Sequence, residues 1–552
     1  MSDRAKRHDG QASTLARAGL TDTSRAVGLL GELGVPDVTD PSAGELVEAL
    51  GRVADPDQAL LGLVRLAEVL PPAEVEELRR LLLDDGAGRE RLVQVLGGST
   101  ALTDHLVRHP EHWHDLLDAR IDDAETLTAA LQADIDARPD DRTLYDALRI
   151  AYRRQLVRIA AVDLTGDPEA AFPQVAAALA DLAAAALEAA LHIARDEVEG
   201  ADRCRLAIIG MGKCGGRELN YISDVDVIFV AEPAEGADED DALAVATALA
   251  TATMRACSAA TGEGNLWTVD ANLRPEGAQG PLVRTVASHR AYYDRWAKTW
   301  EFQALLKARP VAGDAELGQA YLDAVGPLVW QASRRDNFVE DVQAMRRRVE
   351  QHVPPAEAAR QLKLGPGGLR DIEFSVQLLQ LVHGRTDEHI RMRGTLAALE
   401  ALSERGYVGR TDAHDLDDAY RRLRVLEHRI QLYRLRRTHL MPTAEADLRR
   451  LGRSVGLRSD SAEAVTRLWR EQAREVRRMH ERLFYRPLLS AVARLDDDDA
   501  RLSLDDARDR LAALGFRDPG GAIRHVEALT SGVSRRAVMQ RTLLPVMLQW
   551  FA

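Results

Sequence analysis

GMGKCGGRELNYISDVDVIFV, residues 210–230, carries the strongest structural signal in this chain of 552 residues. The paired glycines Gly215 and Gly216 follow an apolar run at 206–209, which predicts a short strand. Glycine pairs let a backbone approach a phosphate closely and direct its N–H groups at the anion. A phosphate-binding turn is therefore the first expectation for Gly215 and Gly216.

Two carboxylates follow at positions i and i+2 of a second apolar run. Residues so spaced share one face of a strand, so Asp224 and Asp226 are expected side by side, with Val225 and Val227 pointing into the core. Carboxylates this close repel each other unless a cation lies between them, and Mg²⁺ or Mn²⁺ suits oxygen ligands. Asp270, on a later apolar segment, adds a third carboxylate. Three carboxylates can bridge two metal ions for in-line displacement at phosphorus.

A surface turn followed by an edge strand with solvated acids would account for Asp224 or Asp226 alone. It does not account for both acids beside apolar strand residues, together with paired glycines and a third acid. The joint pattern therefore favours a catalytic site. Arg274, four residues after Asp270, adds a cation that can bind a phosphate bidentately.

The sequence on either side of this segment predicts an α+β core inside a helical protein. Runs rich in β-branched residues at 206–209, 225–230 and 266–273 predict three strands. An acidic loop at 235–241 and a helix at 242–260 separate the second strand from the third. Elsewhere Ala, Leu and Arg dominate, and the periodicity is helical. The expected fold class is mostly α, with an α+β core flanked by helical bundles.

The length predicts about three or four domains at ~100–200 residues each. We expect a helical region at 1–140, the α+β core with its lead-in helices at 141–330, a second helical region at 331–490 and a helical tail at 491–552. Hydrophobic residues make up 46% of the chain, which is enough for real cores and excludes disorder over the whole length.

The charge balance and the cysteines restrict the partners and the compartment. A net charge of −15 argues against a general nucleic-acid binder, which needs a basic surface. The three cysteines are too few for a disulfide framework and fit a reducing compartment. The apolar stretch 175–194 carries Asp181 and Glu188, so it is expected to be a helix of a soluble protein and not a membrane span. A cytoplasmic protein that binds neither nucleic acid nor membrane is therefore expected.

The whole pattern resembles the nucleotidyltransferase superfamily, with its polymerase-β-like fold. More closely, residues 210–230 resemble the signature of bacterial glutamine-synthetase adenylyltransferase/adenylyl-removing enzymes. Segments similar to that family also occur at 269–285, 300–314 and 363–379. Family members carry two such halves, of which the N-terminal half removes AMP. The motif order, the long helical N-terminus and the single acidic motif resemble that deadenylylating half, so a second half is expected beyond residue 552.

The resemblance implies a metal-dependent nucleotidyltransferase that regulates nitrogen assimilation. Inorganic phosphate would attack the AMP group on a tyrosine of glutamine synthetase and release ADP. The metal-binding and catalytic residues would be Asp224, Asp226 and Asp270. The groups around the phosphates would be Gly215, Gly216, Ser223, Arg274, Lys307 and Arg309. The resemblance also implies PII signal protein as a partner.

Two alternatives stay open at this point. The same metals and carboxylates serve the reverse chemistry, in which tyrosine attacks ATP and a nucleotide-binding adenylyltransferase results. The chain could also be a regulatory scaffold without catalysis, although the intact carboxylates argue against that. Uridylylation of a signal protein is a related activity, but it fits residues 210–230 less well.

Three other motifs have competing interpretations. The segment GPGGLRDIE at 365–373 predicts a glycine-rich turn that opens a helix, with or without an anion at its start. The histidines at 109, 112 and 114 predict the surface start of a helix and not a metal site, because they lack HExxH spacing. The arginines at 434, 436 and 437 predict either a solvated face or a contact with an acidic partner.

Overall fold

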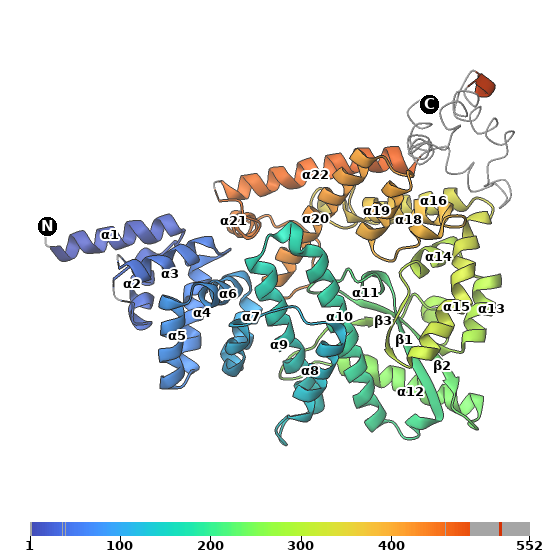
Figure 1. The fold of residues 1–552 in the computed structure, drawn as a ribbon, viewed down its shortest axis with the longest axis horizontal. Helices are drawn as coiled ribbons and strands as arrows, with labels where there is room; N and C mark the ends of the chain where they lie inside the picture. Colours follow the sequence, from blue (N-terminus) through green and yellow to red (C-terminus); the bar gives the residue numbers. More distant parts are fainter. Residues whose placement is uncertain (1–2, 36, 39, 459, 486–517, 522–552) are drawn as a thin grey trace, which may run out of the picture.

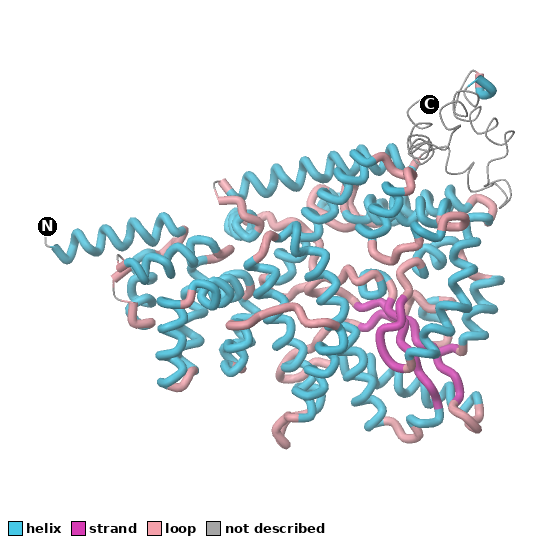
Figure 2. The backbone as a smooth tube through the Cα atoms, viewed as in Figure 1, coloured by secondary structure: helices cyan, strands magenta, loops and turns pink. Residues whose placement is uncertain are grey.

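The computed structural model of the chain describes residues 3–35, 37–38, 40–458, 460–485 and 518–521. Helices form most of this structure, and one small sheet lies among them (Figure 2). The expected helical tail at 491–552 falls outside the described residues, except for 518–521. The mostly α fold class with an α+β core is confirmed.

The N-terminal region is a stack of short helices at one end of the molecule (Figure 1). Aspartate or serine side chains cap several of them: Ser99, for example, accepts a hydrogen bond from the N–H of Leu102 at 3.2 Å. Proline occupies the first turn of three of them, where its missing N–H costs nothing. The helices are α1 (Asp3–Ala18), α2 (Thr23–Glu32), α3 (Pro41–Arg52), α4 (Pro56–Val69), α5 (Pro72–Asp84), α6 (Gly86–Gly98), α7 (Thr100–Arg108) and α8 (Ala124–Asp136).

The mixed sheet positions the acidic residues. Its strands are β1 (Cys204–Gly210), β2 (Val225–Pro233), β3 (Val269–Asp270), β4 (Val283–Arg284) and β5 (Arg309–Gly313). The order is β3-β2-β1-β5, and β4 also pairs with β2. β1 runs antiparallel to β2 and β5, whereas β3 and β4 run parallel to β2.

The two expected strands at 206–209 and 225–230 are confirmed, and both are longer than expected. The third is much shorter than the expected 266–273, because the chain turns at once after Asp270. There the N–H of Asn272 donates to Asp270 Oδ1 at 2.8 Å, and the N–H of Arg274 donates to the Ala271 carbonyl at 3.3 Å.

Each face of the sheet packs against its own set of helices. Alternation along β1 places Leu206 and Ile208 in a core shared with α9 (Leu144–Thr165), α10 (Pro168–Glu197) and α12 (Glu239–Ser258). Ala207 and Ile209 face a second core, to which helices on both sides of β5 in the sequence contribute. Those are α13 (Val286–Arg295), α14 (Thr299–Leu305) and α15 (Ala315–Gln331), while the short α11 (Gly212–Gly215) lies between β1 and β2 in sequence.

Helix α10 contains the alanine-rich stretch 175–194. Among the described residues it is the one helix long and apolar enough to cross a bilayer, and 72% of its most apolar window is buried inside the structure. Such burial is what the central helix of a packed core shows. Asp181, within this helix, pairs with Arg217 at 2.5 Å.

The C-terminal helical region covers the second core (Figure 1). The predicted glycine-rich turn is confirmed, and it opens α18 at Leu369. Gly367 has φ +74°, and a Cβ there would lie 1.8 Å from the Ala473 carbonyl oxygen, so close packing on α22 explains this glycine. The helices are α16 (Phe338–Gln351), α17 (Pro355–Ala358), α18 (Leu369–His383), α19 (Thr395–Glu404), α20 (Arg410–Leu432), α21 (Glu445–Ser454) and α22 (Ser461–Phe484).

The N-terminal and C-terminal helical regions are joined by buried polar contacts. The Ser99 hydroxyl donates to the Leu432 carbonyl at 2.6 Å, and the N–H of Thr100 donates to the Tyr433 carbonyl at 2.8 Å. Arg453 donates to the Gly51 carbonyl at 2.8 Å. The expected boundaries near residues 140, 330 and 490 stay predictions, because one continuous apolar core extends from α1 to the sheet.

The expected surface position of the histidines is wrong for His109 and His112, which are buried. They stack with His105, whose Nε2 lies 3.0 Å from His112 Nδ1. Burial lowers the pKa of His105 to about 2 and that of His112 to about 4. The packing of this region against Glu263, 3.3 Å from His109 Nε2, explains why local spacing failed to predict the burial.

Candidate active site

The three predicted carboxylates lie at one end of β2 and β3. The parallel register pairs Val225 with Val269 and Asp226 with Asp270, so the two aspartates are direct neighbours on the same face. Asp224 immediately precedes β2. Val225 is fully buried and holds the strand end in the core, while Asp226 and Asp270 remain partly exposed. The sheet therefore brings together acids that are 44 residues apart in sequence.

The electrostatics of this end are those of crowded acids. Burial raises the pKa of Asp226, and the charges of Asp270 and Asp224 raise it further. The positive charges of Lys363 and Arg370 oppose this shift. A divalent cation would relieve the same repulsion.

The donor chemistry fits a hard cation such as Mg²⁺, which prefers carboxylate oxygens. In the described part of the chain, however, no three His, Cys, Asp or Glu side chains converge closely enough to hold a metal ion together. Asp224 is engaged with another group, because its Oδ2 lies 2.7 Å from Arg437 Nη2. In this structure Arg437 thus supplies a positive charge to one of the three acids.

The paired glycines are required by packing inside the protein. A Cβ at Gly215 would lie 1.9 Å from the Lys307 carbonyl oxygen, and one at Gly216 would lie 3.1 Å from the Lys307 side chain. Their N–H groups donate to the carbonyls of Met211 and Gly212 within the turn of α11. The phosphate-binding role of both glycines stays a prediction, since these donors already have acceptors.

The other predicted phosphate ligands are also engaged with the protein. Arg274 donates to carbonyls of its own loop, including Ala271 at 2.8 Å. Lys307 is buried and lies 2.5 Å from Glu218 and 3.1 Å from the Thr395 hydroxyl. Arg309 donates to the Cys214 carbonyl at 3.1 Å and so steadies α11.

Ser223 is partly exposed beside Asp224, in the loop between α11 and β2. Ser223 is the predicted phosphate ligand that directly precedes Asp224 in the sequence. The roles of Ser223, Arg274, Lys307 and Arg309 in binding phosphate stay predictions.

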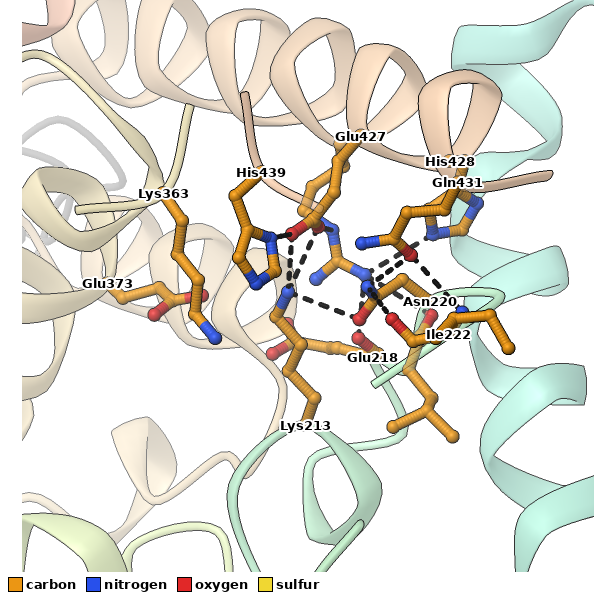
Figure 3. Close-up of polar contacts among 12 residues, drawn as sticks. Lys213, Glu218, Asn220, Ile222, Lys363, Glu373, Glu427, His428, Gln431 and His439 are labelled. Atoms are coloured by element: carbon orange, nitrogen blue, oxygen red, sulfur yellow. Dashed lines mark hydrogen bonds and ion pairs between the residues drawn. The ribbon is translucent and has the colours of Figure 1, made fainter. Parts of the chain in front are cut away.

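The structure adds a buried ionic cluster that sequence reasoning missed (Figure 3). Glu427 of α20 is fully buried and binds Lys213 at 2.9 Å, Arg424 at 3.1 Å and His439 at 2.7 Å. Burial alone would raise the pKa of Glu427, but Lys213 and Arg424 outweigh it and hold that pKa well below its usual value. Burial also lowers the pKa of Lys213 to about 7.

A neighbouring amide network fastens the loop before Asp224 to α20 (Figure 3). Asn220 accepts from Lys213 at 3.3 Å and donates to Gln431 Oε1 at 2.6 Å. Gln431 Oε1 also accepts from the N–H of Ile222 at 3.2 Å. These contacts hold the segment just before Asp224, so α20 positions the loop that leads into β2 from outside the sheet.

One signal in the sequence could have pointed to this cluster. The chain has only five lysines among its 72 basic residues. Three of the five, Lys213, Lys307 and Lys363, lie in this buried region. Lysine is rare in this chain, yet one occurs in each of three segments that resemble the family. A search for motifs alone does not detect this pattern.

A small mixed sheet that carries neighbouring carboxylates, with a short glycine-rich turn beside them and helices around them, defines the nucleotidyltransferase class of enzymes. Comparison with known proteins then points to one family: residues 89–324 match the family described as glutamate-ammonia ligase adenylyltransferase. Residues 343–484 match the family described as GlnD PII-uridylyltransferase. The second match covers most of α16 and all of α17 to α22, with Lys363 and Glu427, but neither Lys213 nor the three aspartates.

Curated relatives support the same family over almost the whole chain. The chain is 58% identical to the bifunctional glutamine synthetase adenylyltransferase/adenylyl-removing enzyme of Streptomyces avermitilis and 57% identical to that of Streptomyces coelicolor. Each alignment covers 99% of this chain and 54% of the relative. The Leifsonia xyli relative is 49% identical over 98% of this chain and 55% of its own length. The resemblance drawn from the sequence is confirmed, and the chain spans about half the length of these relatives.

Proposed function

We propose that this chain removes AMP from an adenylylated tyrosine of glutamine synthetase by metal-dependent phosphorolysis in the cytoplasm, and so regulates nitrogen assimilation. The observation that carries the proposal is the direct pairing of Asp226 with Asp270 beside Asp224. Such a group of acids at one strand end suits in-line displacement at phosphorus. The names of the relatives supply the substrate, glutamine synthetase.

In the proposed reaction, an oxygen of inorganic phosphate forms a bond to the adenylyl phosphorus. The bond from that phosphorus to the tyrosine oxygen breaks, the phenolate takes up a proton, and ADP leaves. Bound at Asp224, Asp226 and Asp270, Mg²⁺ or Mn²⁺ would supply charge neutralisation for the phosphate oxygens. Arg437 would then release Asp224 and become free to meet an anionic substrate group.

The direction of the reaction rests on the resemblance of this chain to the N-terminal half of the family. The opposite reaction, ATP-dependent adenylylation of glutamine synthetase, needs the same three acids and is the main competitor. The PII signal protein is proposed as a regulator on the same resemblance.

The decisive experiment mixes the chain with adenylylated glutamine synthetase, Mg²⁺ and inorganic phosphate. Mass spectrometry follows the loss of tyrosyl-AMP and the appearance of ADP. The Asp224→Ala/Asp226→Ala variant is expected to lose this activity. The matched control is Asp240→Ala/Asp241→Ala, two exposed aspartates at the start of α12, which is expected to keep it.

Phosphate-dependent ADP release that the active-site variant lacks would support the proposal. AMP gain on unmodified glutamine synthetase with ATP, and no release with phosphate, would show that the direction is the reverse. Equal activity in the active-site variant and the control would reject the role of Asp224 and Asp226.

A further inference from the structure

Lys363 stands out because it is a cation without a partner inside a crowded ionic region. Its ammonium makes no hydrogen bond or ion pair with any described residue, whereas Lys213 and Lys307 are both ion-paired. Figure 3 shows its side chain extended beside Glu373, with no contact drawn to its nitrogen. It is only partly exposed, so solvent does not fully replace the missing partner.

Glu373, near the start of α18, is an anion of which one oxygen lacks a hydrogen-bond partner within the residues that the structure describes. Its side chain is 2% exposed, and Arg370 binds one oxygen, Oε2, at 2.9 Å. The other oxygen, Oε1, is buried and has no hydrogen-bond partner among the described residues. Burial would raise the pKa of Glu373, but Arg370 and the three lysines lower it to about 2, so this oxygen is a pure acceptor.

The backbone holds these groups at one place. The N–H of Arg370 donates to the Lys363 carbonyl at 3.0 Å, so the glycine-rich turn closes and sets Lys363 beside Arg370. The N–H of Leu362 donates to the His439 carbonyl at 2.8 Å, next to the Glu427 cluster. The charges of Lys363 and Arg370 both act on Asp226. Lys363, Arg370 and Glu373 therefore lie together, and the two cations are near enough to Asp226 for their charges to act on it.

We propose that Lys363, Arg370 and Glu373 form the site for the attacking phosphate, which is the β-phosphate of the ADP product. Lys363 and Arg370 bind its oxygens, and Glu373 Oε1 accepts the hydrogen bond of its remaining P–OH. This inference deepens the proposed function and rests on it for the assignment of the bound anion as the nucleophile. The adenylyl phosphate itself lies toward the three aspartates.

The assignment accounts for both unpartnered atoms at once. Hydrogen phosphate offers acceptor oxygens to a lysine and an arginine and carries one O–H that needs an acceptor. Sulfate has the same shape and charge but no proton to donate at neutral pH. An ionised carboxylate in the site therefore favours phosphate over sulfate.

The test measures binding by isothermal titration calorimetry with the full 552-residue chain in Mg²⁺, without glutamine synthetase. The probes are inorganic phosphate, sulfate, ADP and AMP. Lys363→Met is expected to weaken phosphate and ADP binding by about 10- to 100-fold, as for the loss of one hydrogen bond to a charged group. AMP lacks the β-phosphate, so the affinity for AMP is expected to stay unchanged.

Two variants make the result interpretable. Lys298→Met, the same change at an exposed lysine before α14, is expected to bind all probes as the wild type does. Lys363→Arg is expected to recover most of the phosphate and ADP affinity, because the positive charge is kept. Thermal unfolding by circular dichroism checks that Lys363→Met remains folded. If it does not, the preference of the wild type for phosphate over sulfate carries the test.

Several outcomes would overturn the inference. These are unchanged phosphate and ADP affinity in Lys363→Met, equal losses for AMP and ADP, wild-type affinity for sulfate equal to that for phosphate, or no phosphate or ADP binding by the wild type. Failure of the proposed function looks different, because adenylylated glutamine synthetase would then yield no ADP while Lys363-dependent phosphate binding persists.

Discussion

The two sides of the site are built in different ways. The carboxylate side comes from one stretch of chain, residues 224–270, and a two-residue strand pairing completes it. The cation side joins α11, the turn at 362–370 and α20, which are as much as 214 residues apart in sequence. The carboxylates are partly exposed and crowded, whereas Lys213 and Lys307 on the cation side are buried and are neutralised by Glu427 and Glu218.

From this difference we expect the two sides to contribute differently to the stability and to the activity of the protein. Crowded like charges on the sheet side oppose folding and suit catalysis. Paired charges on the helical side hold the loop before Asp224, and removal of one member leaves the others uncompensated. Changes on the first side should therefore affect rate, and changes on the second should affect folding.

The largest expected effect is the loss of deadenylylation rate in the Asp226→Asn variant. Loss of one carboxylate of the paired acids is expected to lower the rate of deadenylylation by at least about 10³-fold, because charge stabilisation at phosphorus is lost. The melting temperature should stay equal or rise, since burial and neighbouring acids disfavour the ionised Asp226. A large drop in melting temperature would contradict the contrast between the two sides.

Glu427→Gln is the corresponding change on the helical side. It leaves Lys213, Arg424 and His439 facing a neutral amide, so the expected loss of unfolding free energy is about 3–5 kcal/mol. Urea denaturation measures it. Glu400→Gln, at an exposed position on α19, is the control and is expected to change stability by less than about 0.5 kcal/mol. Equal effects at both positions would mean that the cluster is not a structural anchor.

Gly215→Ala tests the contact between the two sides. The new methyl group would meet the Lys307 carbonyl, so a loss of about 1–3 kcal/mol is expected from forced displacement. Gly326→Ala, in α15, meets nothing within 4 Å and is expected to stabilise by up to about 1 kcal/mol. Thermal unfolding of the pair decides: if both behave alike, packing does not explain the glycine at 215.

The smallest expected effect is a difference in pH dependence. The folded pKa of Lys213 is about 7, below the value of 10.5 for an unperturbed lysine. The unfolded state thus binds more protons between these values, and this group makes stability rise as pH rises from about 7 to 10.5. Asp226 has a raised folded pKa, so its contribution falls as pH rises through the acid range.

Urea unfolding of Lys213→Met and Asp226→Asn against pH separates the two. The alkaline rise should be smaller in the first variant, and the acid-side fall should be smaller in the second. The same profile for both variants and the wild type would remove the electrostatic contrast between the sides.

The sequence was enough to predict the fold class, the two main strands and the three acids, because spacing along one strand determines which side chains share a face. It was not enough to predict the shortness of β3, where Asp270 turns the chain, or the packing role of Gly215. Lys363 and Glu427 could not be assigned, since tertiary packing alone brings the turn before α18 and helix α20 to the region between β1 and β2. Hydrophobic periodicity shows which face of a helix or strand is buried, but not which distant residues that face contacts.

The bond from the Ser99 hydroxyl to the Leu432 carbonyl has a consequence for synthesis of the chain. The two residues are 333 positions apart. At about 5–20 residues per second, a ribosome needs roughly 17–67 seconds between them. During that interval the N-terminal helices emerge from the ribosome before α20 is synthesised. Their surface that later contacts α20 is then exposed, and chaperones or another nascent chain can bind it. A destabilised α7 should therefore lower the yield of soluble protein in cells more than it lowers the melting temperature of the purified protein.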